Sequence, residues 1–454
     1  MRRFLFLLPM TLAAVVAQPE TDAKNTFLAA LDAAKTAQSA DMGSVVTAVL
    51  NATDGDELAY YRLMQEATNS KHPVALTWSA LQMLKQVQAQ GLNPETAPEA
   101  RQLRSYIEEA ARQGYVPALV EMANLHGNGI GGAVDEKKGM NYLMEACKAN
   151  NTRARAVYLL LSGRLSAEGE PSPAVQAELK RSNYYVEEFM SLMTRQGSET
   201  KSKEWLSKAA EHGSPGAACT LAMFHMQEGD VARGYELLKK AVERDHPQAL
   251  SQLATLTLPG TELPEALKGL VHQDTQQAIR LYRKAALLGD TAALMPLAGL
   301  YHQNPEKYTQ ERVFELYRRA ADAGDARGGV AYAYCLVSGR GCAPDPERGV
   351  GILKKLIDAG VPNANVALAE LYFNGVGVEP DMTSAISALS AAASSGMPQA
   401  YTLMAVISQL GNKSRESDPR RAQLYLRMAE ERGEAAPREL FNSMVKNGVW
   451  KLLP

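Results

Sequence analysis

The chain has 454 residues, of which 46% are apolar, only 6% are aromatic and 22% are charged. A chain this long exceeds one ordinary hydrophobic core, so several domains or a repeat array are expected. Its 48 basic residues nearly balance 50 acidic ones, for a formal net charge of −2, which argues against dedicated binding of nucleic acid or anionic membranes. High apolar content with few aromatics excludes disorder as the main state and is typical of stacked helices.

The first 17 residues have the parts of a secretory signal peptide. Arg2 and Arg3 give a positive start, residues 4–16 are apolar, and the small residues at 15–17 precede Gln18. The apolar run is too short to span a bilayer comfortably, and no later stretch reaches about eighteen uninterrupted apolar residues. We therefore expect residues 1–17 to be removed and the mature chain to be exported, either to a periplasm or out of the cell. An N-terminal membrane anchor is the alternative.

From residue 71 onward the sequence repeats with a period near 36 residues. Each unit ends its second helix at an anchor residue, and the last five anchors are spaced by 35 to 37 residues. Most anchors are glycine or asparagine, which accept the left-handed conformation that closes a helix. A period of this size is typical of a helical repeat array. The ten anchors are Lys71, Gly114, Asn150, Gly213, Asp245, Gly289, Gly324, Gly360, Gly396 and Gly433.

Each unit also carries recurring helix signals. A proline two residues past the anchor starts the first helix in five units, a large residue followed by alanine lies in its middle, and the second helix reads large-Leu-x-x-Ala in several units. The spacing of three and four residues places these positions on one helical face. The five prolines are Pro73, Pro215, Pro247, Pro362 and Pro398.

Three units share a Gly-x-Gly-x-x-x-Asp loop between their helices. The glycines permit positive φ in a tight reversal, and the aspartate can cap the second helix. A phosphate-binding loop would follow a strand and precede a lysine, and neither is present, so we interpret the loop as structural. The loop residues are Gly129, Gly131 and Asp135; Gly339, Gly341 and Asp345; and Gly375, Gly377 and Asp381.

With this spacing, the chain resembles the Sel1-like repeat family, whose helix-turn-helix unit is related to the tetratricopeptide repeat. The resemblance implies an all-α fold, an α/α solenoid of about nine to ten helix-turn-helix repeats in a right-handed superhelix. The repeat array is expected over residues 71–433, with insertions near 163–200 and 257–274, the first of them holding a long second helix over 174–196. Residues 18–70 are expected to form a helical cap or degenerate repeat, and 434–454 a capping helix and tail.

The resemblance further implies that the first helices line a concave side that holds protein partners. One line along these helices, at positions six, ten and thirteen past each anchor, is almost uncharged. Two interpretations stay open: packing between neighbouring first helices, or a groove for an apolar or extended peptide segment. The candidate partner-binding residues on this uncharged line are Met223, Met226, Met295, Tyr334, Glu370 and Phe373.

A second row of residues is basic and lies five and six residues before four successive anchors. Cations near helix C-termini interact favourably with the helix dipole, so a structural role is sufficient. Contact with an anionic polymer is the alternative. The row consists of Lys239 and Lys240, Arg283 and Lys284, Arg318 and Arg319, and Lys354 and Lys355.

Four cysteines in an exported chain allow three pairings. Cys335 and Cys342 are seven residues apart and would join a first helix to its loop, so they are the expected disulfide. Buried free thiols are the alternative.

The sequence favours a non-catalytic protein. Its seven histidines are scattered, and no clustered metal-ligand motif is present. Ser198-x-x-Lys201 and Ser443-x-x-Lys446 match the short penicillin-recognising pattern, but its Ser-Asp-Asn and Lys-Thr-Gly partners are missing. We therefore expect an exported, monomeric interaction scaffold that binds a protein or peptide partner and needs no cofactor or metal.

Two alternatives to a bacterial scaffold remain. One is a cell-envelope protein that binds or hydrolyses peptidoglycan or β-lactams. The other is an adaptor of a eukaryotic secretory pathway, which would carry glycans on Asn51, Asn150 or Asn412.

Overall fold

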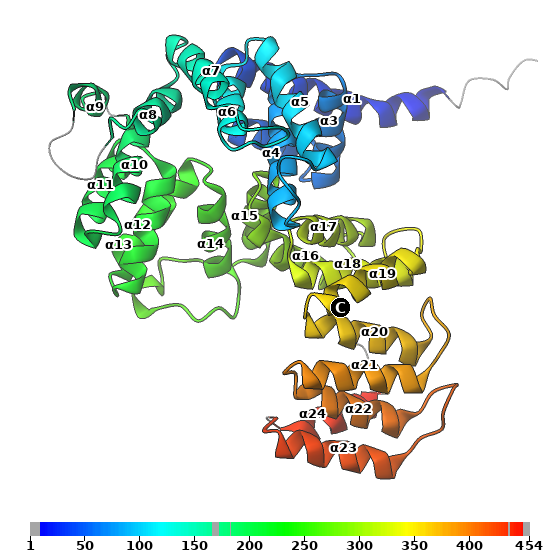
Figure 1. The fold of residues 1–454 in the computed structure, drawn as a ribbon. Helices are drawn as coiled ribbons and strands as arrows, with labels where there is room; N and C mark the ends of the chain where they lie inside the picture. The colour runs from blue at the N-terminus through cyan, green and yellow to red at the C-terminus, as the bar shows by residue number, and fades with distance from the viewer. Residues whose placement is uncertain (1–9, 166–171, 182, 435, 448–454) are drawn as a thin grey trace, which may run out of the picture. The chain divides into compact units, whose positions relative to one another are not determined.

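The computed structural model describes residues 10–165, 172–181, 183–434 and 436–447, and these residues form an all-α protein (Figure 1). Within them there is no β-strand, and the only β-type pairing is an isolated bridge between Asn412 and Arg415. The chain divides into two compact units, with the boundary between Ala293 and Leu294. The all-α fold class expected from the sequence is confirmed.

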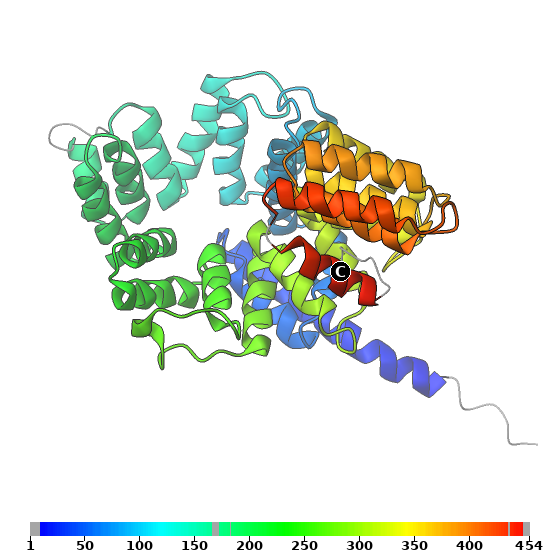
Figure 2. The same ribbon diagram turned by 90° about the horizontal axis from the view of Figure 1, so that it is seen from below.

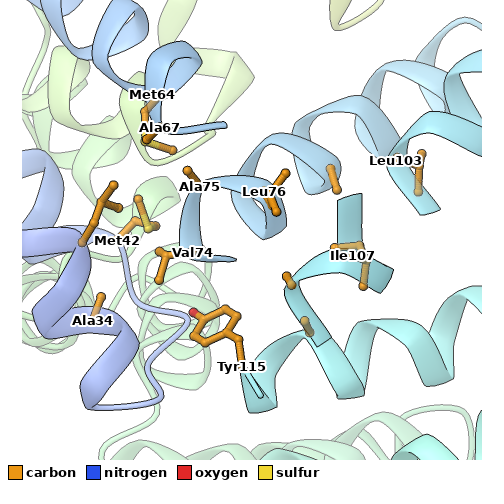
Figure 3. Close-up of a cluster of buried hydrophobic side chains, with 14 of the residues drawn as sticks. Ala34, Met42, Met64, Ala67, Val74, Ala75, Leu76, Leu103, Ile107 and Tyr115 are labelled. Atoms are coloured by element: carbon orange, nitrogen blue, oxygen red, sulfur yellow. The ribbon is translucent and has the colours of Figure 1, made fainter. Parts of the chain in front are cut away.

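The N-terminal part consists of α1 (Met10–Thr36), α2 (Gly43–Ala52) and α3 (Glu57–Asn69). Part of the expected signal peptide, residues 1–9, lies outside the described residues, and the chain is helical from Met10. Phe27 and Leu31 of α1 are buried in a cluster that continues into the first hairpin. Figure 3 shows this cluster, in which Met42 lies near Val74 and Met64 lies beside Ala67. The N-terminal helices therefore share one hydrophobic core with the start of the array.

Nine antiparallel helical hairpins follow in the described residues, in agreement with the expected number of repeats. In the first unit they are α4 (Pro73–Ala89) with α5 (Pro98–Arg112), α6 (Val116–Gly127) with α7 (Glu136–Lys148), α10 (Tyr184–Thr194) with α11 (Glu199–Glu211), α12 (Pro215–Gln227) with α13 (Val231–Glu243), and α14 (Pro247–Thr257) with α15 (Thr275–Leu287). In the second unit they are α16 (Leu294–His302) with α17 (Gln310–Asp322), α18 (Ala326–Ser338) with α19 (Pro346–Asp358), α20 (Pro362–Asn374) with α21 (Met382–Ser394), and α22 (Gln399–Leu410) with α23 (Pro419–Glu431), followed by α24 (Pro437–Asn447). Two 3-10 turns, η1 (Glu265–Leu267) and η2 (Thr291–Ala293), lie before and after α15.

The prediction of one long helix over residues 174–196 is wrong. Two further helices, α8 (Thr152–Leu161) and α9 (Pro173–Leu179), lie between α7 and α10, and α10 is the first helix of a hairpin with α11 rather than a second helix. Asn183 separates α9 from α10: its side-chain amide donates to the Thr152 carbonyl and to a Glu178 carboxylate oxygen, both at 3.0 Å. An asparagine side chain bonded in this way competes with helix continuation.

All ten anchors have positive φ, from 56° at Asp245 to 93° at Gly213 and Gly289. Seven of them are glycine, for which this conformation carries no steric cost. Lys71, Asn150 and Asp245 adopt it despite their side chains. The turn that closes each second helix is therefore the same throughout the array, whichever residue occupies it.

The three Gly-x-Gly loops also have one geometry. Their six glycines have φ between 64° and 72°, and the aspartates accept hydrogen bonds from backbone amides of the second helix, as Asp135 does from Lys138 at 2.9 Å. The second glycine of each loop lies against backbone of the preceding repeat. A Cβ at Gly131 would overlap the carbonyl of Ala100, and one at Gly341 would overlap the carbonyl of Gln310. These loops are thus contacts between repeats as well as turns.

Gly341→Ala should destabilise the protein more than Gly360→Ala, a matched change at positive φ in open space. The control carries only the backbone cost of about 1 kcal/mol, whereas Gly341→Ala also forces the loop away from Gln310 and should cost about 3 kcal/mol. Urea unfolding followed by far-UV circular dichroism measures both. Equal losses of stability would contradict the close approach between repeats.

Candidate functional site

The candidate residues in the second unit lie in the interior. Tyr334 of α18 is 4% exposed, Glu370 of α20 is fully buried and Phe373 is 8% exposed. The Tyr334 hydroxyl donates to Glu370 Oε1 at 2.8 Å, across adjacent repeats. Burial, together with the neighbouring carboxylate, raises the pKa of Tyr334, which keeps the phenol protonated as a donor.

The hydrophobic partners of these side chains come from neighbouring helices. Tyr334 packs in a cluster with Leu368 and Leu371 of α20, and Phe373 packs with Met382 of α21 and Ile407 of α22. At these positions the structure favours the packing interpretation of the uncharged line. The side chains join successive repeats and do not form an open groove.

The three methionines differ from this pattern. Met223 of α12 is 43% exposed, while Met226, one turn further along α12, is half-buried against a core cluster. Met295 is half-buried on α16, in the second unit. The structure thus places Met223 and Met226 on one helix and leaves Met223 as the exposed member of the predicted set.

Polar side chains that sequence reasoning missed lie on α14 and α15, next to α12 in the array. Ser251 and Thr255 of α14 occupy the positions equivalent to Cys219 and Met223. Ser251 donates to the Asp290 carboxylate, and the hydroxyls of Thr255 and Tyr282 are 2.7 Å apart. The sequence signal that could have identified this site is the position of Asp290, which directly follows the Gly289 anchor.

The titratable groups near Asp290 are not activated for catalysis. Burial raises the pKa of Cys219 to about 11, with Asp290 adding to the shift, so its thiol stays protonated at neutral pH. Burial also lowers the pKa of His246, against the effect of Asp290. His246 is the N-cap of α14, with Nδ1 3.4 Å from the Ala249 amide. The geometry is that of helix capping and packing, with no activated nucleophile.

The predicted basic row is largely paired with carboxylates. Lys239 lies 2.7 Å from Glu236, Lys284 lies 2.5 Å from Asp245, and Arg283 lies 3.4 Å from Glu57. Arg318 and Arg319 both contact Glu315. These five cations have intramolecular partners, which favours the structural interpretation, while Lys240, Lys354 and Lys355 are exposed.

The disulfide expected between Cys335 and Cys342 is not formed: all four cysteines are free thiols. The Cys342 thiol instead donates to the backbone carbonyl of Cys335 at 3.5 Å, while the Cys335 side chain is buried in α18. Burial raises the pKa of Cys335 to about 12, which disfavours the thiolate that disulfide formation requires.

Within the parts of the chain that the structure describes, there is no group of three or more histidines, cysteines and acids that could hold a metal ion. None of the described helices combines the length and apolar character needed to cross a membrane.

Comparison with known proteins supports the repeat assignment. The Sel1 repeat model matches residues 116–151, 189–214, 247–290, 314–325, 330–361, 362–397 and 398–434. The chain is similar to chitin synthase regulator SKT5 of Saccharomyces cerevisiae, with 24% identity over 253 residues, covering 53% of this chain and 32% of that protein. It is also similar to chitin synthase regulatory factor 3 of Schizosaccharomyces pombe, with 22% identity, covering 48% of this chain and 27% of that protein. The chain therefore spans about a third or less of these relatives.

The chain is also similar to two solved structures. One is c5321, a protective antigen of uropathogenic Escherichia coli with an SLR fold, at 20% identity and a TM-score of 0.43, covering 96% of this chain and 98% of that one. The other is a Sel1 repeat protein from Oxalobacter formigenes, at 21% identity and a TM-score of 0.40, covering 54% of this chain and 96% of that one. With its nine helical hairpins and seven matched segments, the chain is a Sel1 repeat protein of the tetratricopeptide-like helical-repeat type.

Proposed function

We propose that this chain is an exported, non-catalytic scaffold that binds a protein partner through the exposed side of its first helices, with α12 as the main contact. Sel1 repeat proteins are generally protein-interaction scaffolds. The observation that carries the proposal is Met223, a large flexible apolar side chain that remains exposed on a helix whose other apolar residues are mostly buried. Methionine adapts to varied partner surfaces, which suits this role.

The names of the relatives support a role exerted through another protein. Both yeast proteins are named as regulators of chitin synthase. Sel1 repeats make up much of this chain, so we infer that binding, and not the particular enzyme, is what this chain has in common with them. A rigid array binds without the ordering cost of a flexible receptor.

The serine pattern that suggested an envelope hydrolase has a structural explanation. Ser198 is the N-cap of α11, and its hydroxyl accepts from the Lys201 amide at 3.3 Å. The Ser198-x-x-Lys201 spacing is therefore the spacing of a helix cap, while Ser443 and Lys446 both lie within α24. Together with the protonated thiols of Cys219 and Cys335, this supports the non-catalytic scaffold over the β-lactam or peptidoglycan enzyme.

Met223→Asp should weaken recovery of a crosslinked partner from the native envelope or secreted fraction at least about tenfold, because a charge would be desolvated at the contact. Leu270→Asp is the matched control, since Leu270 is 58% exposed but lies in the loop between α14 and α15. Quantitative mass spectrometry of tagged pull-downs measures the change. Equal recovery by both variants, each folded by circular dichroism, would contradict a contact on α12.

Tyr334→Phe should lower the free energy of unfolding by about 1–3 kcal/mol, because the buried Glu370 carboxylate loses a donor. Glu370→Gln should lose less, since its amide oxygen can still accept from Tyr334. Chemical denaturation of the two variants gives the comparison. Unchanged stability of Tyr334→Phe combined with weaker partner recovery would favour the groove interpretation instead.

Export predicts that the chain isolated from its native source begins at Gln18. Intact-mass analysis and N-terminal sequencing of that material provide the test. A chain that keeps residues 1–17 and stays with the membrane fraction would support the anchor alternative.

A further inference from the structure

Helix α15 packs against the chain's own N-terminal helices, although more than 200 residues separate them in sequence. Most other helix contacts in the described residues join sequence neighbours. In Figure 2 the helices of the first unit, coloured from blue to yellow-green, follow a ring in which the last lie beside the first. The contact between α2 and α15 closes this ring.

This contact is here called the seam. It consists of three meetings between the α13–α14 turn, α15 or the turn after α15 on one side, and α2, the start of α3 or α4 on the other. Its residues are Gly43, Gly55, Glu57 and Lys85 on the N-terminal side, and Asp245, Arg283, Leu287 and Gly289 on the array side.

The centre of the seam is an ion pair in the interior. Arg283 Nε lies 3.4 Å from Glu57 Oε2, and the two side chains are only 10% and 2% exposed. The Arg283 guanidinium also lies against Gly55, with its Cζ 3.2 Å from where a Cβ would be. A buried charge that loses its partner is strongly unfavourable. Each of these two residues therefore depends on closure of the ring for its environment.

The two edges of the seam add polar contacts. Lys85 Nζ donates to the Gly289 carbonyl at 2.8 Å. Asp245, an anchor residue, lies over the first turn of α2 and also pairs with Lys284. A carboxylate at a helix N-terminus interacts favourably with the helix dipole.

At Gly43 the start of α2 and the Asp245 side chain are also close enough that only a residue without a side chain fits between them. A Cβ on this residue would overlap the Asp245 carboxylate and would lie 2.9 Å from the Asp245 Cβ. Leu287 completes the contact, because it is buried in the hydrophobic cluster of the N-terminal helices.

We propose that the seam acts as a clasp. Contact between α2 and α15 closes the first unit into a ring, and loss of this contact alone opens it. Each hairpin of a repeat array packs mainly on its sequence neighbours, and small rotations between repeats add up along it. Opening the clasp therefore changes the spacing of the first helices without unfolding any hairpin. Its effect on a partner that spans several repeats rests on the proposed function, whereas the closure does not.

The test is a distance measurement across the seam in the full chain. Spin labels on non-canonical amino acids at Asn51 of α2 and Arg280 of α15, both exposed, leave the native cysteines in place. Electron double resonance should give one narrow distance in the otherwise unaltered chain. A broad distribution there would overturn the proposal.

Gly43→Ala is the sharpest variant, because alanine favours a helix over glycine and any opening must come from the collision with Asp245. It should shift most molecules to longer distances with unchanged helix content. Gly127→Ala, a helical glycine of α6 in open space, should leave the distance unaltered. A short distance that persists in folded Gly43→Ala would overturn the clasp.

Reversing the charges of the Glu57–Arg283 ion pair gives an independent test of the clasp. Glu57→Arg should open the ring, and Glu57→Arg/Arg283→Glu should restore at least half of the closed population. If Glu57→Arg fails to fold, Gly43→Ala decides. Because no partner is present in these measurements, their outcome is separate from that of the pull-down with Met223→Asp.

Discussion

The array depends on one backbone feature, the left-handed residue that ends the second helix of each repeat. All ten anchors adopt it, although only seven are glycine. Where glycine is absent, the side chain or backbone has another contact: Asn150 accepts from Arg155 at 2.5 Å, and the Lys71 carbonyl accepts from Gln113. Asp245 pairs with Lys284 and faces Gly43 at the seam. The strain of these turns is thus offset by contacts that glycine could not make in the case of Asn150 and Asp245.

Polar links between successive repeats are the second constraint on the array. Tyr334 donates to Glu370, and Thr402 donates to Glu434 at 2.6 Å, each across about one repeat. Ser251 and Asp290 make a comparable link in the first unit. In alanine-rich cores, which pack in many similar ways, directional bonds of this kind favour one register between repeats. This explains why an almost uncharged line contains the buried Glu370.

Several side chains of chemically reactive types have structural roles in the described residues. The thiols of Cys219 and Cys335 are protonated, His246 caps a helix, and Ser198 caps another. These four side chains cap helices or pack in the interior, and in the proposed scaffold the exposed Met223 would meet the partner. A surface of that kind recognises a partner by shape and apolar contact.

The sequence by itself determined the hairpins, the anchors and the Gly-x-Gly loops, because left-handed turns and helix caps are properties of a few adjacent residues. It did not determine which face of a first helix is covered: the period places Met223 and Tyr334 on the same line, yet one is exposed and the other buried. It also missed the break at Asn183 and the pairing of Glu57 with Arg283. Only the tertiary structure decided these, because burial and pairing between distant residues depend on how repeats stack, which leaves no local signal in the chain.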